Sequence, residues 1–131
     1  GAINHRLGLD DCLMLKDTHL KTIVDLKEFI KKARKGISWV TKIEIECETF
    51  EQVVEAMEAG GDIIMCDNMS PEQIREVANY KNEKHPHIML EASGNITEET
   101  IQGYSKSGVD AISSGSITHQ STWLDFSMKF D

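Results

Sequence analysis

Residues Thr41 to Glu48 read TKIEIECE, a short run in which apolar and charged side chains alternate. Successive side chains of a β-strand point to opposite faces, so the run predicts a strand with one apolar and one acidic face. The apolar face holds Ile43, Ile45 and Cys47, and the acidic face holds Glu44, Glu46 and Glu48. Both faces of an all-parallel sheet are covered, so we expect at least the central acids to point into protein.

Similar apolar runs recur along the chain, and an amphipathic stretch follows each of the first four. The runs cover residues 12–17, 41–48, 62–67, 87–93 and 109–115. Repeated strand–helix units of this length predict an α/β fold with parallel strands and right-handed crossovers. A doubly wound sheet and a (β/α) barrel both fit, and both place chemistry at the carboxyl ends of the strands. A last alternating segment, WLDFSMKF, closes the chain at residues 123–130.

Helix boundaries can be read from several local signals. Thr49 and Gln52 have the spacing of a capping box, and that helix is expected to end at Gly60-Gly61. Another helix is expected from Ser70, with Pro71 at its first position and a reciprocal Gln73. Apolar residues at helical spacing predict a third helix that Gly36 stops, and Thr97 is the expected cap of a helix reaching Gly108. The third helix is defined by Ile23, Leu26, Ile30 and Ala33.

Composition excludes several classes of protein. The chain has 131 residues, 40% apolar and 27% charged, which is ordinary for one globular domain. No apolar run reaches the roughly 18–20 residues that span a bilayer. With 22 acidic and 14 basic side chains the formal charge is −8, which argues against nucleic-acid or anionic-membrane partners.

The cysteines predict the compartment. Cys12, Cys47 and Cys66 are odd in number, lack CxxC spacing and lie in or beside apolar runs. We therefore expect buried, reduced thiols in a cytoplasmic protein, and the absence of a basic–apolar leader agrees with that expectation.

Polar residues end four successive strands on the acidic face. Period-two alternation carries this face through all four strands, which end in Lys16, Glu46, Asp67 and Ser93. Taken singly, each has a simpler structural explanation, such as a solvated strand end or a turn. Their common register predicts a polar ring at a barrel mouth, where a buried carboxylate needs a cation, a metal ion or several hydrogen-bond donors.

Two glycine-containing turns and one basic segment are candidate anion sites. Ser93-Gly94-Asn95 precedes a helix start, and residues 113–116 read SSGS after the fifth strand. Glycine allows backbone N–H groups to approach a phosphate closely. Upstream, Asn4-His5-Arg6 supplies a fixed cation able to bind a carboxylate or a phosphate in bidentate fashion.

In combination, these motifs resemble the quinolinate phosphoribosyltransferase family over essentially the whole chain. The motifs are NHRLGLDDCLMLKDTH, IEIECE, DIIMCDNMSPE, LEASGNIT, VDAISSGSITH and the terminal LDFSMKF. The resemblance implies a partial TIM-type barrel, with residues 1–131 forming its carboxyl-terminal part. The amino-terminal sandwich domain and the first barrel strands would be absent. It also implies transfer of phosphoribose from phosphoribosyl pyrophosphate to quinolinate, with magnesium, then loss of CO₂ to give nicotinate mononucleotide in NAD biosynthesis.

The resemblance also implies roles for individual residues. His5 and Arg6 would hold a quinolinate carboxylate, and Lys16 would add a cation near the pyridine. Glu46 and Asp67 would face the ribose hydroxyls and the magnesium–pyrophosphate, binding Mg²⁺ directly or through water. The 5-phosphate would lie on Ser93, Gly94, Asn95 and Gly115, with His119 close by. Lys16, Glu46 and Asp67 are therefore the expected catalytic residues.

The sequence departs from the family pattern in two places. Asn95 stands where a second glycine is usual, and asparagine tolerates a left-handed backbone better than most residues. Thr18 stands where the family has Asn, next to the lysine motif. The family completes its sites with a second subunit, so a homodimer or higher oligomer is expected. The 131 residues alone are expected to bind anions weakly and to turn over poorly.

Two other functions remain open at the sequence level. An aldolase-like barrel could use Lys16 as a Schiff-base nucleophile. The chain could also be a non-catalytic assembly module that keeps the fold without the chemistry.

Overall fold

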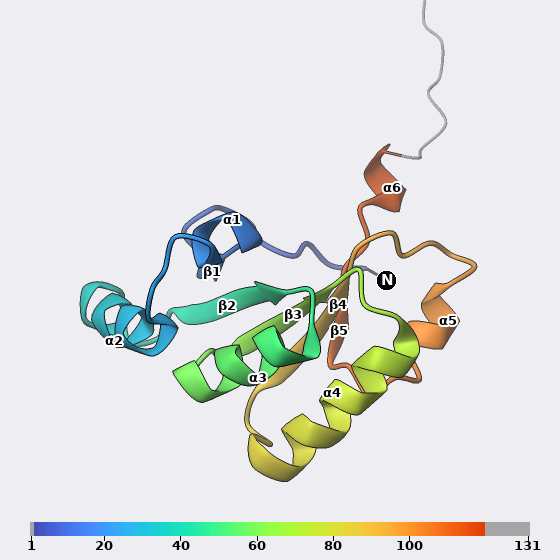
Figure 1. Cartoon of the computed structure of the whole chain (residues 1–131). Helices are drawn as coiled ribbons and strands as arrows, with labels where there is room; N and C mark the ends of the chain where they lie inside the picture. The colour runs from blue at the N-terminus through green and yellow to red at the C-terminus, as the bar shows by residue number, and fades with distance from the viewer. Residues whose placement is uncertain (1, 120–131) are drawn as a thin grey trace, which may run out of the picture.

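The computed structural model of the chain describes residues 2–119, and Figure 1 shows a sheet with helices packed against it. The predicted terminal strand at 123–130 lies outside the described residues. The strands are β1 (Cys12–Leu15), β2 (Lys42–Cys47), β3 (Ile63–Asp67), β4 (Met89–Ser93) and β5 (Ala111–Ile112). The helices are α1 (Asp17–Leu20), α2 (Leu26–Gly36), α3 (Phe50–Ala59), α4 (Pro71–Lys84), α5 (Ile101–Tyr104) and α6 (Ser116–His119).

The order of the strands distinguishes the two candidate architectures. All neighbouring strands pair in parallel, and the sheet order β1-β2-β3-β4-β5 follows the sequence. Helices α2, α3 and α4 cover the same face of this sheet (Figure 1). A doubly wound sheet reverses its strand order and carries helices on both faces, so the described residues form a partial barrel.

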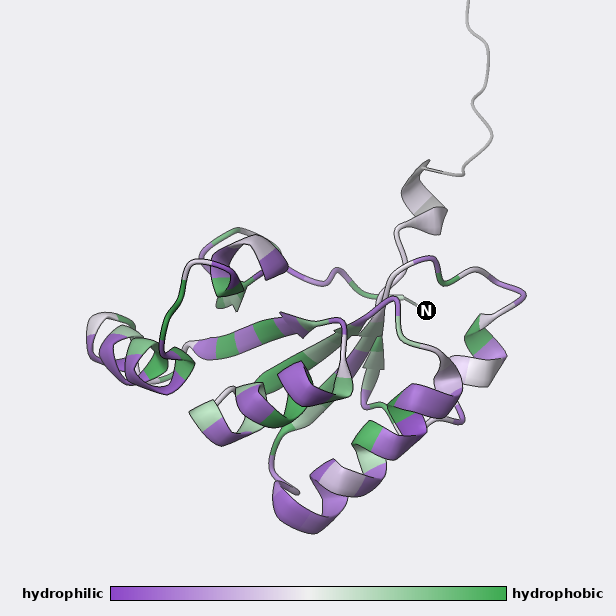
Figure 2. Ribbon diagram, in the orientation of Figure 1, coloured by the Kyte–Doolittle hydropathy of each residue, from purple (hydrophilic) through white to green (hydrophobic). Residues whose placement is uncertain are grey.

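The helix-facing side of the central strands forms the core. The residues of β2, β3 and β4 on this side are almost completely buried: Ile43, Ile45, Cys47, Ile64, Cys66, Leu90 and Ala92. Val53 and Met57 of α3 and Ile74 and Val77 of α4 cover them from the helix layer. Figure 2 shows the corresponding pattern, with hydrophobic residues on the strands and hydrophilic residues on the outer faces of the helices.

Helices α3 and α4 begin where the sequence predicts. The Thr49 side chain accepts a hydrogen bond from the backbone N–H of Gln52, and the Gln52 side chain accepts one in return at Thr49. Ser70 and Gln73 form the same reciprocal pair at the start of α4. Gly60 ends α3 in the left-handed conformation, with φ of 98°, that glycine adopts without steric cost.

Two other helices differ from their predicted extent, although α2 does end at Gly36 as expected. Ile23 lies in the connection between α1 and α2, because the Asp25 side chain caps α2 by accepting from the backbone N–H of Glu28. The helix expected from Thr97 to Gly108 contains only one turn, α5, and its cap position is Thr100. The hydroxyl groups of Thr97 and Thr100 are used within this loop, so neither caps a long helix. Within the described residues, no helix has the length and apolar content needed to cross a membrane.

Ile64 tests the importance of the core. Its side chain is fully buried at the centre of β3, so Ile64→Ala should lower the free energy of unfolding by about 3 kcal/mol, measured by urea denaturation. Val24→Ala is the control, because Val24 is fully exposed and its truncation should change stability little. Equal losses from the two variants would contradict this description of the core.

Candidate active site at the carboxyl ends of the strands

Strand register determines which predicted site residues lie together. Met65 of β3 is paired with Glu46 on one side and with Glu91 on the other. Asp67 pairs with Ser93, two residues further toward the carboxyl edge of the sheet. These side chains lie on the face of the sheet opposite α2, α3 and α4, which is the inner face of a barrel. The predicted common face is confirmed for Glu46, Asp67 and Ser93, but Glu46 lies one side-chain step before the Asp67–Ser93 pair, and Lys16 directly follows β1.

Lys16 and Glu46 form the first part of the site. The Lys16 Nζ lies 3.8 Å from Glu46 Oε2, and the Glu46 side chain is only 14% exposed. Lys16 is also the cap residue of α1, where its backbone N–H donates to His19 Nδ1. The end of β1 thus holds the lysine beside the carboxylate while its ammonium group stays accessible.

The ends of β3 and β4 are joined through asparagine side chains. The backbone N–H of Asn68 donates to the Ser93 carbonyl, and the Asn95 side-chain amide donates to Asn68 Oδ1 at 2.9 Å. The Asn68 amide also donates to Asp67 Oδ2 at 2.7 Å, which orients that carboxylate. Asn95 has φ of 50°, so the residue at the family's glycine position does adopt the left-handed backbone. The sequence analysis did not single out Asn68.

Three residues that are distant in sequence meet on the inner face. His5 Nε2 lies 3.3 Å from Glu44 Oε1 and 3.2 Å from Glu91 Oε2. The sequence pattern placed Glu44 on the correct face without assigning it to the site, and Glu91 lies on the same face, two residues before Ser93. The available signal was that each glutamate lies between two apolar residues of a strand, which indicates a buried carboxylate. Burial, and then the charge of Glu91, raise the pKa of Glu44 above that of an ordinary glutamate, whereas His5 and Cys12 lower it.

Arg6 lies near β1. Its charge and a side-chain hydrogen bond lower the pKa of the Cys12 thiol, but burial and the neighbouring Glu44 raise that pKa more. The half-buried Cys12 Sγ donates to Glu44 Oε2 at 3.4 Å. The structure therefore places His5 against Glu44 of β2 and Glu91 of β4, and Arg6 near Cys12 of β1.

The predicted turn after β5 makes several hydrogen bonds within the protein. Ser113 Oγ donates to Glu91 Oε1, and Ser114 Oγ donates to the Ile96 carbonyl. Gly115 accepts a hydrogen bond from the backbone N–H of Thr118 at 3.0 Å. His119 is the last residue of α6, and its side chain lies outside the part of the chain that the structure describes.

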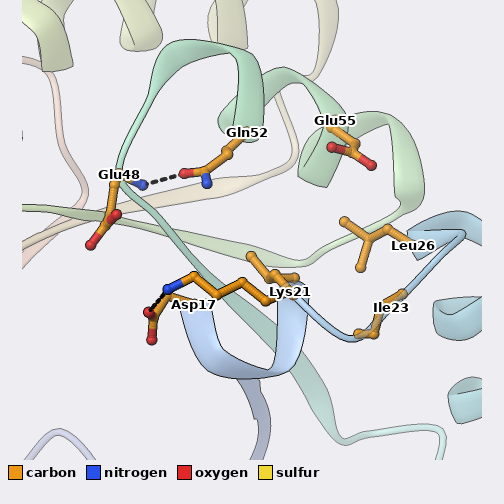
Figure 3. Close-up of a pocket in the computed structure, with 8 residues that line it drawn as sticks. Asp17, Lys21, Ile23, Leu26, Glu48, Gln52 and Glu55 are labelled. Atoms are coloured by element: carbon orange, nitrogen blue, oxygen red, sulfur yellow. Dashed lines mark hydrogen bonds and ion pairs between the residues drawn. The ribbon is translucent and has the colours of Figure 1, made fainter.

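A separate pocket lies between α1 and the start of α3 (Figure 3). Its walls include Leu20, Ile23 and Leu26 together with Asp17, Lys21, Glu48, Gln52 and Glu55. Lys21 is paired with Asp17 at 2.9 Å, and Gln52 accepts from the Glu48 backbone. The pocket contains no predicted site residue, and its acidic side chains are unsuited to anionic substrates.

Two sets of side chains have metal-ligand chemistry. Glu46 and Asp67 supply only oxygen atoms, the ligand type that Mg²⁺ prefers, at adjacent strand ends. His5, Glu44 and Glu91 bring one ligand atom each within 4.8 Å of one another, which is a nitrogen–oxygen set.

One known protein family matches nearly the whole chain. The family described as "Quinolinate phosphoribosyl transferase, C-terminal domain" matches residues 1–129. The chain belongs to the quinolinate phosphoribosyltransferase family. The match extends over the three sets of residues described above: the basic segment, the polar strand ends and the turns after β4 and β5.

Relatives of the quinolinate phosphoribosyltransferase family match in sequence and in structure. The chain is 42% identical over 128 residues to a probable nicotinate-nucleotide pyrophosphorylase [carboxylating] of Bacillus subtilis, covering 98% of the chain and 43% of the relative. It is 33% identical over 129 residues to the human nicotinate-nucleotide pyrophosphorylase [carboxylating], with the same coverages. NadC from Streptococcus pyogenes aligns with a TM-score of 0.83 at 41% identity, covering 99% of the chain and 45% of that structure.

The chain thus spans less than half the length of these relatives. The matched family description confirms that it corresponds to their carboxyl-terminal part.

Gly94 is predicted to be essential for the turn after β4, which packs against Asn68. Its φ is +89°, and a Cβ atom there would lie 2.8 Å from the Asn68 backbone nitrogen. We expect Gly94→Ala to displace Asn68 and lower the unfolding free energy by at least about 1 kcal/mol, measured by urea denaturation. Gly36→Ala is the matched control, because a Cβ there meets nothing within 4 Å. Equal stability in the two variants would contradict the proposed close contact.

The three thiols should react in a defined order. Burial raises the pKa of Cys66 to about 12 and raises that of Cys47 even further. At pH 8 the thiolate fraction of Cys66 is then on the order of 10⁻⁴, so alkylation should be very slow. Cys12 is only half-buried and should react first when the native protein is treated with iodoacetamide and analysed by mass spectrometry. Faster labelling of Cys47 or Cys66 would contradict this order, and the urea-unfolded protein is the control.

Proposed function

We propose that this chain is the catalytic part of an enzyme that transfers phosphoribose from phosphoribosyl pyrophosphate to quinolinate. The reaction gives nicotinate mononucleotide, pyrophosphate and CO₂, a step of NAD biosynthesis. The observation that supports the proposal is the convergence of Lys16, Glu46, Asp67, Ser93 and the His5–Arg6 segment on one edge and inner face of a partial barrel. Relatives named carboxylating nicotinate-nucleotide pyrophosphorylases support the reaction class.

The cationic residues would bind the pyridine dicarboxylate. His5 and Arg6 hold one carboxylate, and the exposed ammonium group of Lys16 lies near the ring. Fixed cations orient a dianion because a charge-assisted hydrogen bond is both strong and directional. With the ring held in place, its nitrogen can attack the anomeric carbon of the sugar.

The acidic residues would stabilise the transition state. As the bond between the anomeric carbon and pyrophosphate oxygen breaks, its electron pair leaves with pyrophosphate and the sugar becomes oxocarbenium-like. Glu46 and Asp67 face this positive charge and the ribose hydroxyls. They also fit Mg²⁺, which when bound would neutralise the charge of the leaving pyrophosphate. A ring carboxylate then departs as CO₂, and a proton replaces it.

The turns after β4 and β5 would hold the sugar 5-phosphate. Ser93, Gly94 and Asn95 form a turn in which two consecutive residues have positive φ, a geometry that presents backbone N–H groups to an anion. Gly115 and His119 would add to this site from the segment after β5. Barrel enzymes often bind phosphate on the loops of their last strands.

The complete protein is required for full activity in this proposal. The chain covers under half of its relatives, so further substrate-binding cations would come from the remaining part. The isolated 131 residues should bind anions weakly and turn over slowly. We further propose that the enzyme is cytoplasmic and works as a homodimer or higher oligomer.

The geometry is less favourable to the alternative functions. A Schiff-base lysine must have its amine free to attack a carbonyl, but Lys16 Nζ lies 3.8 Å from Glu46 Oε2 as an ion-pair partner. An assembly module would not need a carboxylate, a lysine and a glycine turn with positive φ at one barrel edge.

Substitutions of Lys16 and Asp67 test the proposed mechanism. In the complete protein, Lys16→Ala and Asp67→Ala should each lower kcat/KM at least about 100-fold, because each removes a charge that acts on the substrates or the transition state. Pyrophosphate release from quinolinate and phosphoribosyl pyrophosphate is the measurement. Lys31→Ala is the control, because Lys31 pairs with Glu28 on the exposed side of α2. Full activity in both site variants would rule out this assignment.

A further inference from the structure

Two buried carboxylates have no part in the mechanism described above. Glu44 is 2% exposed and Glu91 is 4% exposed, on β2 and β4. Burying two like charges on neighbouring parts of a sheet is costly unless the protein compensates for them. Their surroundings therefore indicate what they do.

Both carboxylates are held in the same way. The Cys12 thiol donates to one oxygen of Glu44 at 3.4 Å, and the Ser113 hydroxyl donates to one oxygen of Glu91. The second oxygen of each lies next to the same atom, His5 Nε2. Of the two, Glu91 accepts the hydrogen bond, whereas Glu44 Oε1 is buried and has no hydrogen-bond partner in the described structure.

His5 connects the segment before β1 to the sheet. It belongs to the segment before β1, which forms neither helix nor strand, and Arg6 is in the same segment. The backbone N–H groups of Leu7 and Gly8 bind Asp11, a contact inside the segment. The contacts of His5 with β2 and β4 link this segment to the sheet across a long stretch of sequence.

We propose that Glu44 and Glu91 are positioning residues for substrate binding, an inference that rests on the proposed function. They hold Nε2–H of His5 toward the sheet, which leaves Nδ1 as the ring atom able to bind the substrate. On substrate binding the ring donates from Nδ1 to a quinolinate carboxylate, while Glu44 and Glu91 remain against Nε2. The same contacts keep Arg6 over the inner face.

Steady-state kinetics of the complete protein provide the first test. Glu91→Met removes the acceptor at nearly constant length, so KM for quinolinate should rise about tenfold while KM for phosphoribosyl pyrophosphate stays within about twofold. Glu91→Gln should give a smaller rise, because its amide oxygen still accepts a hydrogen bond. Glu58→Gln on the exposed face of α3 is the control and should change neither constant. Equal rises in both KM values, or no rise, would contradict the proposal.

The ring of His5 provides a test that needs no turnover. ¹⁵N NMR of the imidazole, assigned by the loss of its signals in His5→Gln, should show a proton on Nε2 in the substrate-free wild type. In Glu91→Met the Nδ1–H tautomer should become populated. Ser113→Ala, which frees the other oxygen of Glu91, should cause a smaller change in the same direction. It replaces Glu91→Met as the test if that variant does not fold. A wild-type Nδ1–H tautomer, or identical spectra in all variants, would overturn the proposal.

The same three side chains could hold a metal ion instead, and this outcome is distinguishable. Their ligand atoms lie within 4.8 Å of one another. Titration of the wild type with Zn²⁺ and with Mn²⁺ should show no stoichiometric binding at this cluster. Stoichiometric binding that is lost in Glu91→Met would overturn the positioning role. If the wild type releases no pyrophosphate, the proposed function fails, while the NMR result still decides how His5 is held.

Discussion

Parallel pairing of β2, β3 and β4 is the constraint on which the rest of the structure depends. The helix-facing side chains of these strands are aliphatic or thiol groups that are almost fully buried under α3 and α4. A shift in register by one residue would turn this apolar set to the other face and expose it. The register is therefore fixed by the core, and the inner face receives whatever residues alternate with the core residues.

The acidic residues on the inner face lower the stability of the fold unless their burial is compensated. Glu44 and Glu91 alternate with Ile43, Ile45, Leu90 and Ala92, so folding of the core necessarily buries the two acids. The protein compensates with Cys12, Ser113 and His5 as neighbours of the carboxylates. The contacts of Glu44 and Glu91 with His5 thereby tie the segment before β1 to the inner face of the sheet.

The sequence predicted a large part of this structure for local reasons. The strands and the starts of α3 and α4 depend on alternation and on capping pairs within a few residues, such as Thr49 with Gln52. The errors also have local causes, since the Asp25 cap interrupts the helix expected around Ile23 and the Thr97–Thr100 loop replaces a long helix. The shared face of Glu46, Asp67 and Ser93 could be predicted because side-chain parity survives from strand to strand in a parallel sheet.

By itself, the sequence determined the strand–helix alternation, the two faces of each strand and the residues that end them, because these depend on neighbours along the chain. Only the tertiary structure decided the sequential strand order, the Asn68–Asn95 link between turns and the meeting of His5 with Glu44 and Glu91. These contacts join residues up to 86 positions apart. No local sequence pattern predicts such a contact, because the residues come together only when the strands of the sheet pair.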